Sequence, residues 1–320
     1  MKRSFPILVA LTAVLAVSCA TAPAAVPTPV ALVTGSSAGT YYPLGRAIAG
    51  LVGAPGGGFT VEVRTTGGAT ANLNLLRERY ADVAFAQNDL AAFAFEGSEM
   101  FRREPPAAAF VELRGVATLY DETCHILARA DSGIASLADL LGRRVAVGAA
   151  GSGVEAEARA IMAAAGVGFD RIEPWYLNFY EVAESLGSGE LDAVFTTVGH
   201  PSAAVADLVA RFDLVLVPVD AATVASLRDS YPAFVPAVIP AGTYPGIDKD
   251  VPTVAIRAML AVRADAPDAL VRSLLAALFE SGDALAAAHP RGADIQKADA
   301  LLGMTIPLHP AAARWFGVEP

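Results

Sequence analysis

The sequence predicts an α/β protein with two similar lobes. Short β-forming runs alternate with amphipathic helical patterns, which is typical of sheets covered by helices. Residues 191–195 repeat the pattern of residues 81–85, and each run follows a helix and precedes a polar loop. Two long extended segments, 113–130 and 251–265, are suited to cross between lobes.

The first residues predict an export signal. Lys2 and Arg3 precede an uncharged stretch over 5–17, which is too short to span a bilayer. Two cleavage sites fit: lipoprotein processing that acylates Cys19, or ordinary cleavage near residues 20–22. We favour the first, although Ala16 stands where a lipobox prefers Leu. We therefore expect a signal peptide over 1–19, a tether over 20–29 and a periplasmic or other extracytoplasmic protein, attached to a membrane only through a lipid on Cys19.

Composition limits the possible partners. A formal net charge of −10 argues against nucleic acid, which rewards basic faces. Hydrophobic residues make up 54% of the chain, enough for a sizeable core. If Cys19 is lipidated or removed, Cys124 has no intrachain partner, so the core alone must stabilise the fold.

The elements of the first lobe follow from periodicity. We predict strands at 30–34, 59–65 and 82–86, with helices from about Tyr42, from Ala69 and after residues 87–89. Segment 113–130 is predicted as two strands broken at 120–123. Helices over 268–288 are expected to return to this lobe, which would comprise 30–121 and 252–320.

The second lobe, predicted over 122–251, repeats this order. We expect a short capped helix at 136–141, a strand at 145–147, a glycine loop at 148–153, a helix at 154–165 and a strand at 191–195.

Strand-loop-helix junctions at 34–42, 65–72 and 148–155 are rich in glycine and hydroxyl residues, and a fourth occurs at 196–202. Helix N-termini carry unsatisfied N–H groups and positive dipole ends, which bind anions. Glycine lets a ligand approach the backbone. The junctions therefore predict a shared cleft that binds a small carboxylate.

Enzyme motifs are not matched. Ser152 lacks the glycines of a nucleophile elbow, because Ala150 and Val154 stand in their places. The glycine loops fit neither a P-loop nor a dinucleotide fingerprint. The four histidines have no metal-ligand spacing. We expect no enzyme activity, cofactor or metal; a nucleophilic Ser152 or Cys124 is the least favoured interpretation.

Three residue types have alternative interpretations. His200 is either a cleft residue or the start of a helix. Of Tyr41 and Tyr42, one is expected to cover the ligand and the other to pack in the core. Arg64 could pair a carboxylate, but we expect a solvated position.

Several motifs resemble the TAXI family of solute receptors for TRAP transporters. Two are Thr-Gly-Ser-Ser-Ala-Gly-Thr-Tyr-Tyr-Pro-Leu-Gly over 34–45 and Ala-Asp-Val-Ala-Phe-Ala-Gln-Asn-Asp-Leu-Ala over 81–91. Others lie at 65–73, 129–140, 240–246 and 307–316, so the resemblance covers nearly everything after the tether.

This resemblance implies a periplasmic-binding-protein fold of the second type, with two lobes joined by hinge strands, each a mixed sheet flanked by helices. It implies a receptor that delivers glutamate, glutamine or a related dicarboxylate to a TRAP membrane permease driven by an ion gradient. The alternative is a sensory receptor for a signalling kinase. The implied ligand-binding residues are Gly39, Thr40, Tyr41, Tyr42, Gly67, Gly68, Ala69, Gln87, Asn88, Asp89, Ser152, Gly153, Val154, Glu155, Thr196, Gly199, His200 and Pro201.

The sequence departs from the family pattern in three places, one of which is Cys124-His125, where Val-His or a similar pair is usual. Val154 replaces a threonine, which removes a hydroxyl donor, and Asn88 stands where Ser is common. These departures make glutamate itself a less secure expectation.

Overall fold

The computed structural model describes residues 26–37, 39–54, 58–102 and 109–319. The predicted signal peptide, Cys19 and most of the tether lie outside the described residues. Within them, no helix is both long and apolar enough to cross a membrane.

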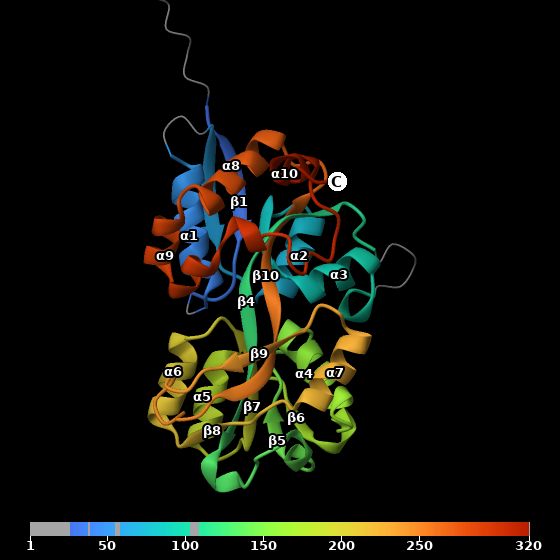
Figure 1. The fold of residues 1–320 in the computed structure, drawn as a ribbon, viewed down its shortest axis with the longest axis vertical. Coiled ribbons are helices and arrows are strands. Elements are labelled where there is room, and N and C mark those ends of the chain that lie inside the picture. The colour runs from blue at the N-terminus through green and yellow to red at the C-terminus, as the bar shows by residue number, and fades with distance from the viewer. Residues whose placement is uncertain (1–25, 38, 55–57, 103–108, 320) are drawn as a thin grey trace, which may run out of the picture.

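Two lobes, each a sheet with helices on both faces, are joined end to end (Figure 1). In the first lobe the strand order is β2-β1-β3-β10-β4. Its short strands are β1 (Thr28–Val33), β2 (Phe59–Arg64) and β3 (Val83–Gln87). Its helices are α1 (Tyr41–Val52), α2 (Ala69–Arg77), α3 (Asn88–Glu96), α8 (Asp268–Phe279), α9 (Gly282–Ala288) and α10 (Pro310–Phe316).

The second lobe uses the other halves of β10 and β4, followed by β7, β5 and β6. Its own strands are β5 (Arg144–Ala146), β6 (Glu173–Trp175), β7 (Ala193–Val198), β8 (Leu214–Leu216) and β9 (Val235–Ile239). Its helices are α4 (Gly153–Ala164), α5 (Phe179–Gly187), α6 (Ala203–Arg211) and α7 (Ala221–Ser230).

Two long antiparallel strands, β4 (Leu113–Arg129) and β10 (Val251–Arg263), run through both lobes (Figure 1). The predicted break at 120–123 is wrong, because β4 is continuous there. Asp121 pairs with Arg257 across the two strands, and their side chains form an ion pair at 2.8 Å. The polar residues that suggested a turn instead have partners on other elements of the fold.

The predicted repeat between the lobes has a structural basis. Asp82 precedes β3, and its carboxylate accepts the N–H of Ala31 in the neighbouring β1 at 2.8 Å. Asp192 precedes β7, and its carboxylate accepts the N–H of Arg144 in the neighbouring β5 at 2.9 Å. β3 is parallel to β1, and β7 is parallel to β5.

Apolar side chains fill both faces of each sheet. Helix α1 buries Leu44, Ile48 and Val52 at helical spacing, and the C-terminal helices α8 and α9 pack against it. The expectation that residues 268–288 return to the first lobe is therefore confirmed. β1 begins at Thr28, so the last two residues of the predicted tether are already paired with β2. The lobe boundaries at 121/122 and 251/252 stay predictions.

Candidate functional site

A cavity of about 180 Å³ lies between the lobes, which we call the glycine cavity. The first lobe contributes the starts of α1 and α2, the end of β3 and Glu122 of β4; the second contributes the start of α4 and the end of β7. Its lining residues are Gly35, Gly39, Thr40, Tyr41, Gly67, Gly68, Ala69, Gln87, Glu122, Ser152, Gly153, Val154, Thr197 and Val198.

Three helix N-termini meet at this cavity. α1 and α2 begin after Thr40 and Gly68, and neither residue caps its helix with a side chain. Gly68 has φ 112°, a conformation that favours glycine. At α4, the Ser152 hydroxyl accepts the N–H of Glu155 at 3.3 Å. First-turn N–H groups of both lobes are thus directed toward one small space.

Glu122 is the buried carboxyl of the glycine cavity. The Tyr41 hydroxyl lies 2.9 Å from Glu122 Oε2 and 3.2 Å from the carbonyl oxygen of Ala86. Burial raises the pKa of Glu122 to about 8, against opposing hydrogen bonds from Tyr41 and Gln87. Because a tyrosine hydroxyl carries one proton, a protonated Glu122 lets both contacts form: Glu122 donates to Tyr41, and Tyr41 to Ala86. At neutral pH the cavity therefore holds a neutral acid that does not repel an anion.

The lobes touch beside the glycine cavity. A Cβ atom on Gly153 would lie 2.4 Å from Gln87 Oε1 and 2.8 Å from Leu90 Cδ1. Glycine therefore permits the start of α4 to approach the other lobe this closely.

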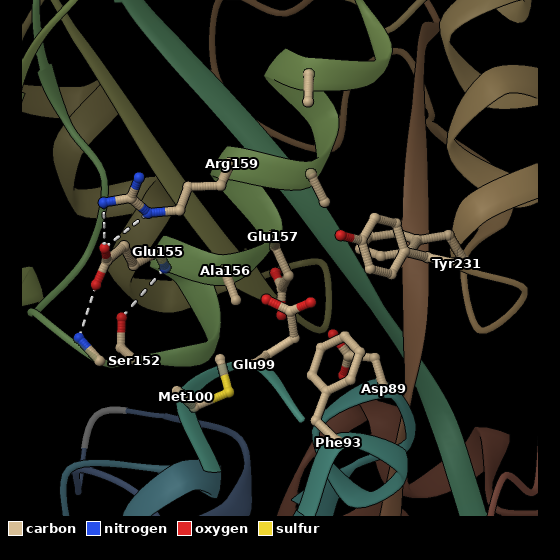
Figure 2. Close-up of a pocket in the computed structure, with 14 residues that line it drawn as sticks. Asp89, Phe93, Glu99, Met100, Ser152, Glu155, Ala156, Glu157, Arg159 and Tyr231 are labelled. Carbon is tan, nitrogen blue, oxygen red and sulfur yellow. Dashed lines mark hydrogen bonds and ion pairs between the residues drawn. The ribbon is translucent and has the colours of Figure 1, made fainter. Parts of the chain in front are cut away.

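A second cavity, of about 350 Å³, lies between α3 and the following turn of one lobe and α4 of the other; we call it the acidic cavity (Figure 2). Its lining residues are Asp89, Phe93, Glu99, Met100, Gly151, Ser152, Glu155, Ala156, Glu157, Arg159, Ala160, Ala163, Tyr231 and Phe234. The two cavities share Ser152.

Two of its carboxyls are almost fully buried, Asp89 and Glu157. Burial raises the pKa of Asp89 to about 7 and places that of Glu157 well above its usual range. The nearby Asp89 charge raises the pKa of Glu157 further. Glu155 is different, because it accepts the N–H of Gly151 at 2.7 Å and pairs with Arg159.

Most of the predicted site residues lie at these two cavities. From the prediction, the glycine cavity collects Gly39, Thr40, Tyr41, Gly67, Gly68, Ala69, Gln87, Ser152, Gly153 and Val154. Asp89 and Glu155 line the acidic cavity. Tyr41 lies on the glycine cavity and also stacks on Phe85 in the core, with ring centroids 4.8 Å apart.

The other predicted residues line neither cavity: Tyr42, Asn88, Thr196, Gly199, His200 and Pro201. Asn88 is fully buried, where it donates to the carbonyl of Gly303 at 3.1 Å and accepts the N–H of Arg257 at 3.0 Å. His200 Nδ1 lies 2.8 Å from the Thr123 hydroxyl in the hinge. These contacts hold elements together.

Arg64, Cys124 and His125 lie outside both cavities. Arg64 is exposed and pairs with Glu62 at 2.6 Å, which confirms its solvated position. Cys124 is buried, and burial raises its thiol pKa, which disfavours a nucleophilic role. His125 Nε2 contacts the Tyr244 hydroxyl at 2.9 Å.

Sequence reasoning missed Glu122 and Glu157, whereas Thr197 lies within the predicted junction at 196–202. Glu122 sits in a run that resembled a turn. Glu157 had a usable signal: Gly153, Glu157 and Ile161 are four residues apart on one face of α4, and all three are buried. A carboxylate on a buried helix face indicates a functional position. Among the described residues, no group of three or more His, Cys, Asp or Glu side chains could hold a metal ion.

Two α/β lobes with cavities between them are the features of a two-lobed binding-protein fold. The chain belongs to the NMT1-like family, which matches residues 32–317.

Solved structures with periplasmic-binding-protein folds are similar over most of the chain. The periplasmic aliphatic sulphonate binding protein SsuA from Escherichia coli has a TM-score of 0.53 at 15% identity, over 92% of this chain and 84% of that one. The alkanesulfonate-binding protein SsuA from Xanthomonas axonopodis pv. citri, bound to MOPS, has a TM-score of 0.53 at 15% identity, over 92% and 81%. A Bordetella bronchiseptica RB50 protein has a TM-score of 0.53 at 18% identity, over 92% and 90%. The predicted fold is thereby confirmed.

Proposed function

We propose that the protein is an extracytoplasmic solute receptor of the TAXI type. Its lobes close on a small carboxylate or amino acid and deliver it to a TRAP membrane permease. The supporting observation is the convergence of three helix N-termini, from both lobes, on the glycine cavity. The similar structures include periplasmic binding proteins, and the sequence motifs support the TRAP partner.

The geometry explains how closure would select a solute. The N–H groups near Gly67, Gly68 and Gly153 hold the carboxylate. Tyr41 and Gln87 contact the remainder, and closure expels water and strengthens these hydrogen bonds. At about 180 Å³ the cavity is smaller than a typical drug-sized ligand pocket, which favours a small metabolite. Val154 adds an apolar surface to the same space.

A thermal-shift screen tests this proposal. The mature protein is heated with single carboxylates and amino acids, and bound material from purification is identified by mass spectrometry. A ligand at about one hundred times its dissociation constant adds about 2.7 kcal/mol to the free energy of unfolding. We expect at least one small carboxylate or amino acid to raise the melting temperature. If none does, the proposed solute class is wrong.

Delivery to a permease needs a separate measurement. Proteoliposomes that contain a candidate TRAP permease should accumulate the identified solute only when the receptor and an ion gradient are both present. Uptake that is independent of the receptor would contradict the transport role.

A further inference from the structure

The acidic cavity has an excess of carboxyl groups over basic groups at the lobe interface. Asp89 and Glu99 come from the first lobe, and Glu155 and Glu157 come from α4 of the second. Arg159 is the cation among the lining residues, and it pairs with Glu155 at 2.7 Å. Its guanidinium also stacks on Phe169, 3.7 Å from the ring centroid. The other three carboxyls therefore lack a countercharge from the lining.

Glu157 is the most informative residue. Its side chain is buried, with the residue 2% exposed, and its Oε1 atom has no hydrogen-bond partner. The Oε2 atom accepts a hydrogen bond from the Thr197 hydroxyl. Figure 2 shows the carboxylates of Glu157 and Glu99 pointing into the cavity from opposite sides. A buried oxygen without a partner is costly, so it indicates a missing donor.

Asp89 lies beside Glu157 and is also 2% exposed. Its Oδ1 atom accepts the N–H of Leu90 at 2.7 Å, which leaves further acceptor capacity on the carboxyl. In the described part of the chain, no lysine or arginine forms an ion pair with Asp89 or Glu157.

Aromatic rings form the opposite wall. Phe93 and Tyr231 meet edge to face at 6.0 Å, and Tyr231 meets Phe234 at 6.3 Å. Phe93 lies on α3 of the first lobe. In the second lobe, Tyr231 directly follows α7 and Phe234 directly precedes β9. Ring faces attract organic cations and cover their alkyl parts, whereas a bare metal ion would need more oxygen ligands.

We propose that the acidic cavity is a second binding site, for an organic cation with an ammonium or guanidinium group. Asp89 and Glu157 are its carboxylate partners, and Phe93 and Tyr231 pack on its apolar part. The cation supplies the donor that Glu157 Oε1 lacks, and it bridges the lobes. The proposal does not depend on a carboxylate in the glycine cavity.

The test compares two probes of similar shape, one of which is charged and the other neutral. Isothermal titration of the mature protein with 1-aminobutane is set beside titration with 1-butanol. We expect measurable binding of the amine and at least tenfold weaker binding of the alcohol. Equal binding of the two probes would overturn the proposal, because an apolar pocket with protonated acids would not distinguish them.

Isosteric variants locate the site. Glu157→Gln and Asp89→Asn should each weaken 1-aminobutane binding at least tenfold, while Glu280→Gln, at an exposed position after α8, should leave it unchanged. Circular dichroism verifies that each variant is folded. Unchanged amine binding in both cavity variants would also overturn the proposal.

A competition experiment identifies the source of the cation. L-lysine carries both a carboxylate and a distant ammonium, and the two cavities share Ser152. If the cation is one end of a single solute, L-lysine displaces 1-aminobutane and propionate together. If the cation is a separate molecule, 1-aminobutane still binds in the presence of saturating propionate and is displaced by 1,4-diaminobutane. Failure of every amine to bind refutes this site, while a carboxylate that still binds leaves the proposed function intact.

Discussion

Glu122 gives the glycine cavity a charge that depends on pH. The titratable and charged groups that face it are Tyr41, Tyr120, Asp89, Glu157 and Arg291. The Tyr41 hydrogen bond and the Arg291 charge favour ionisation of Glu122, and the Asp89 charge opposes it. With a pKa of about 8, Glu122 is largely neutral at pH 7 and largely ionised at pH 9.5.

We therefore expect carboxylate binding to weaken as the pH rises through 8, because an ionised Glu122 repels the anion. The loss should be about tenfold between pH 7 and pH 9.5, and titration calorimetry measures it. In Glu122→Gln, which cannot ionise, affinity should be nearly flat over the same range. A wild-type affinity that is flat or rises with pH would contradict this role.

Gly153 sets how closely the lobes can approach. In Gly153→Ala, the new Cβ would meet Gln87 and Leu90, which are both buried. We expect solute binding to weaken by about 1 to 3 kcal/mol, because the closed state becomes overpacked. Gly50→Ala on α1 is the matched control, since a Cβ added there would meet nothing within 4 Å. Equal affinities of the two variants would exclude this contact as a determinant of closure.

Sequence alone could predict the glycines of the site, together with Asp89 and Glu155, but not Glu122 or Glu157. Gly39, Gly67 and Gly153 follow strands in loops, so their place at the sheet edge is local information. The environments of Glu122 and Glu157 depend on packing between lobes. A carboxyl becomes functional there only because distant elements exclude water from it.

At the scale of single elements, Ser152 both caps α4 and faces the glycine cavity. Ser152→Ala should lower the free energy of unfolding by about 1 kcal/mol through loss of the cap. It should also weaken carboxylate binding by roughly 1 to 2 kcal/mol if the hydroxyl contacts the charged ligand. Urea denaturation and calorimetry measure the two effects.

Asp220→Ala separates these two effects. Asp220 caps α7 by accepting the N–H of Thr223 at 2.8 Å, and it lines neither cavity. The Asp220→Ala variant should lose a similar free energy of unfolding, with no change in carboxylate binding. If both variants bind equally well, the Ser152 hydroxyl makes no contact with the ligand.

The prediction of strands and helices succeeded where neighbouring residues determine the structure, and failed where distant residues determine it. The acids Asp82 and Asp192 could be matched from sequence, because each stands one residue before a strand of the same pattern. The continuity of β4 could not, since the partners of these polar residues lie far along the chain. Asp121 pairs with Arg257 on β10, Glu122 contacts Tyr41 on α1, and Thr123 contacts His200 after β7.

At the scale of the whole molecule, buried acids make stability depend on pH. The folded pKa values of Asp89 and Glu122, about 7 and about 8, exceed the ordinary values of 3.8 and 4.5. Between pH 6.5 and 8 the folded state therefore binds more protons than the unfolded state. The free energy of unfolding should fall as the pH rises through this window.

Below pH 6.5 the histidines act in the opposite direction. Burial lowers the pKa values of His125, His200, His289 and His309, so their contribution to stability is lost as the pH falls. Urea denaturation at pH 6.5 and 8 measures the slope due to the acids. The double variant Asp89→Asn, Glu122→Gln should flatten it, and a wild-type stability that rises in this window would disprove the assignment.

The crossing of β4 and β10 also constrains how the chain acquires its structure. β3 lies early in the sequence, but in the sheet it stands between β1 and β10. Phe85 therefore cannot pair with Leu260 until β10 has been synthesised. The whole predicted second lobe, residues 122–251, is synthesised after Phe85 and before Leu260. We expect the second lobe to fold first and the first lobe to close around it, with slow kinetics, because distant segments pay loop entropy before they gain contacts. Until β10 arrives, β3 presents an open edge, which makes nascent chains dependent on protection from aggregation.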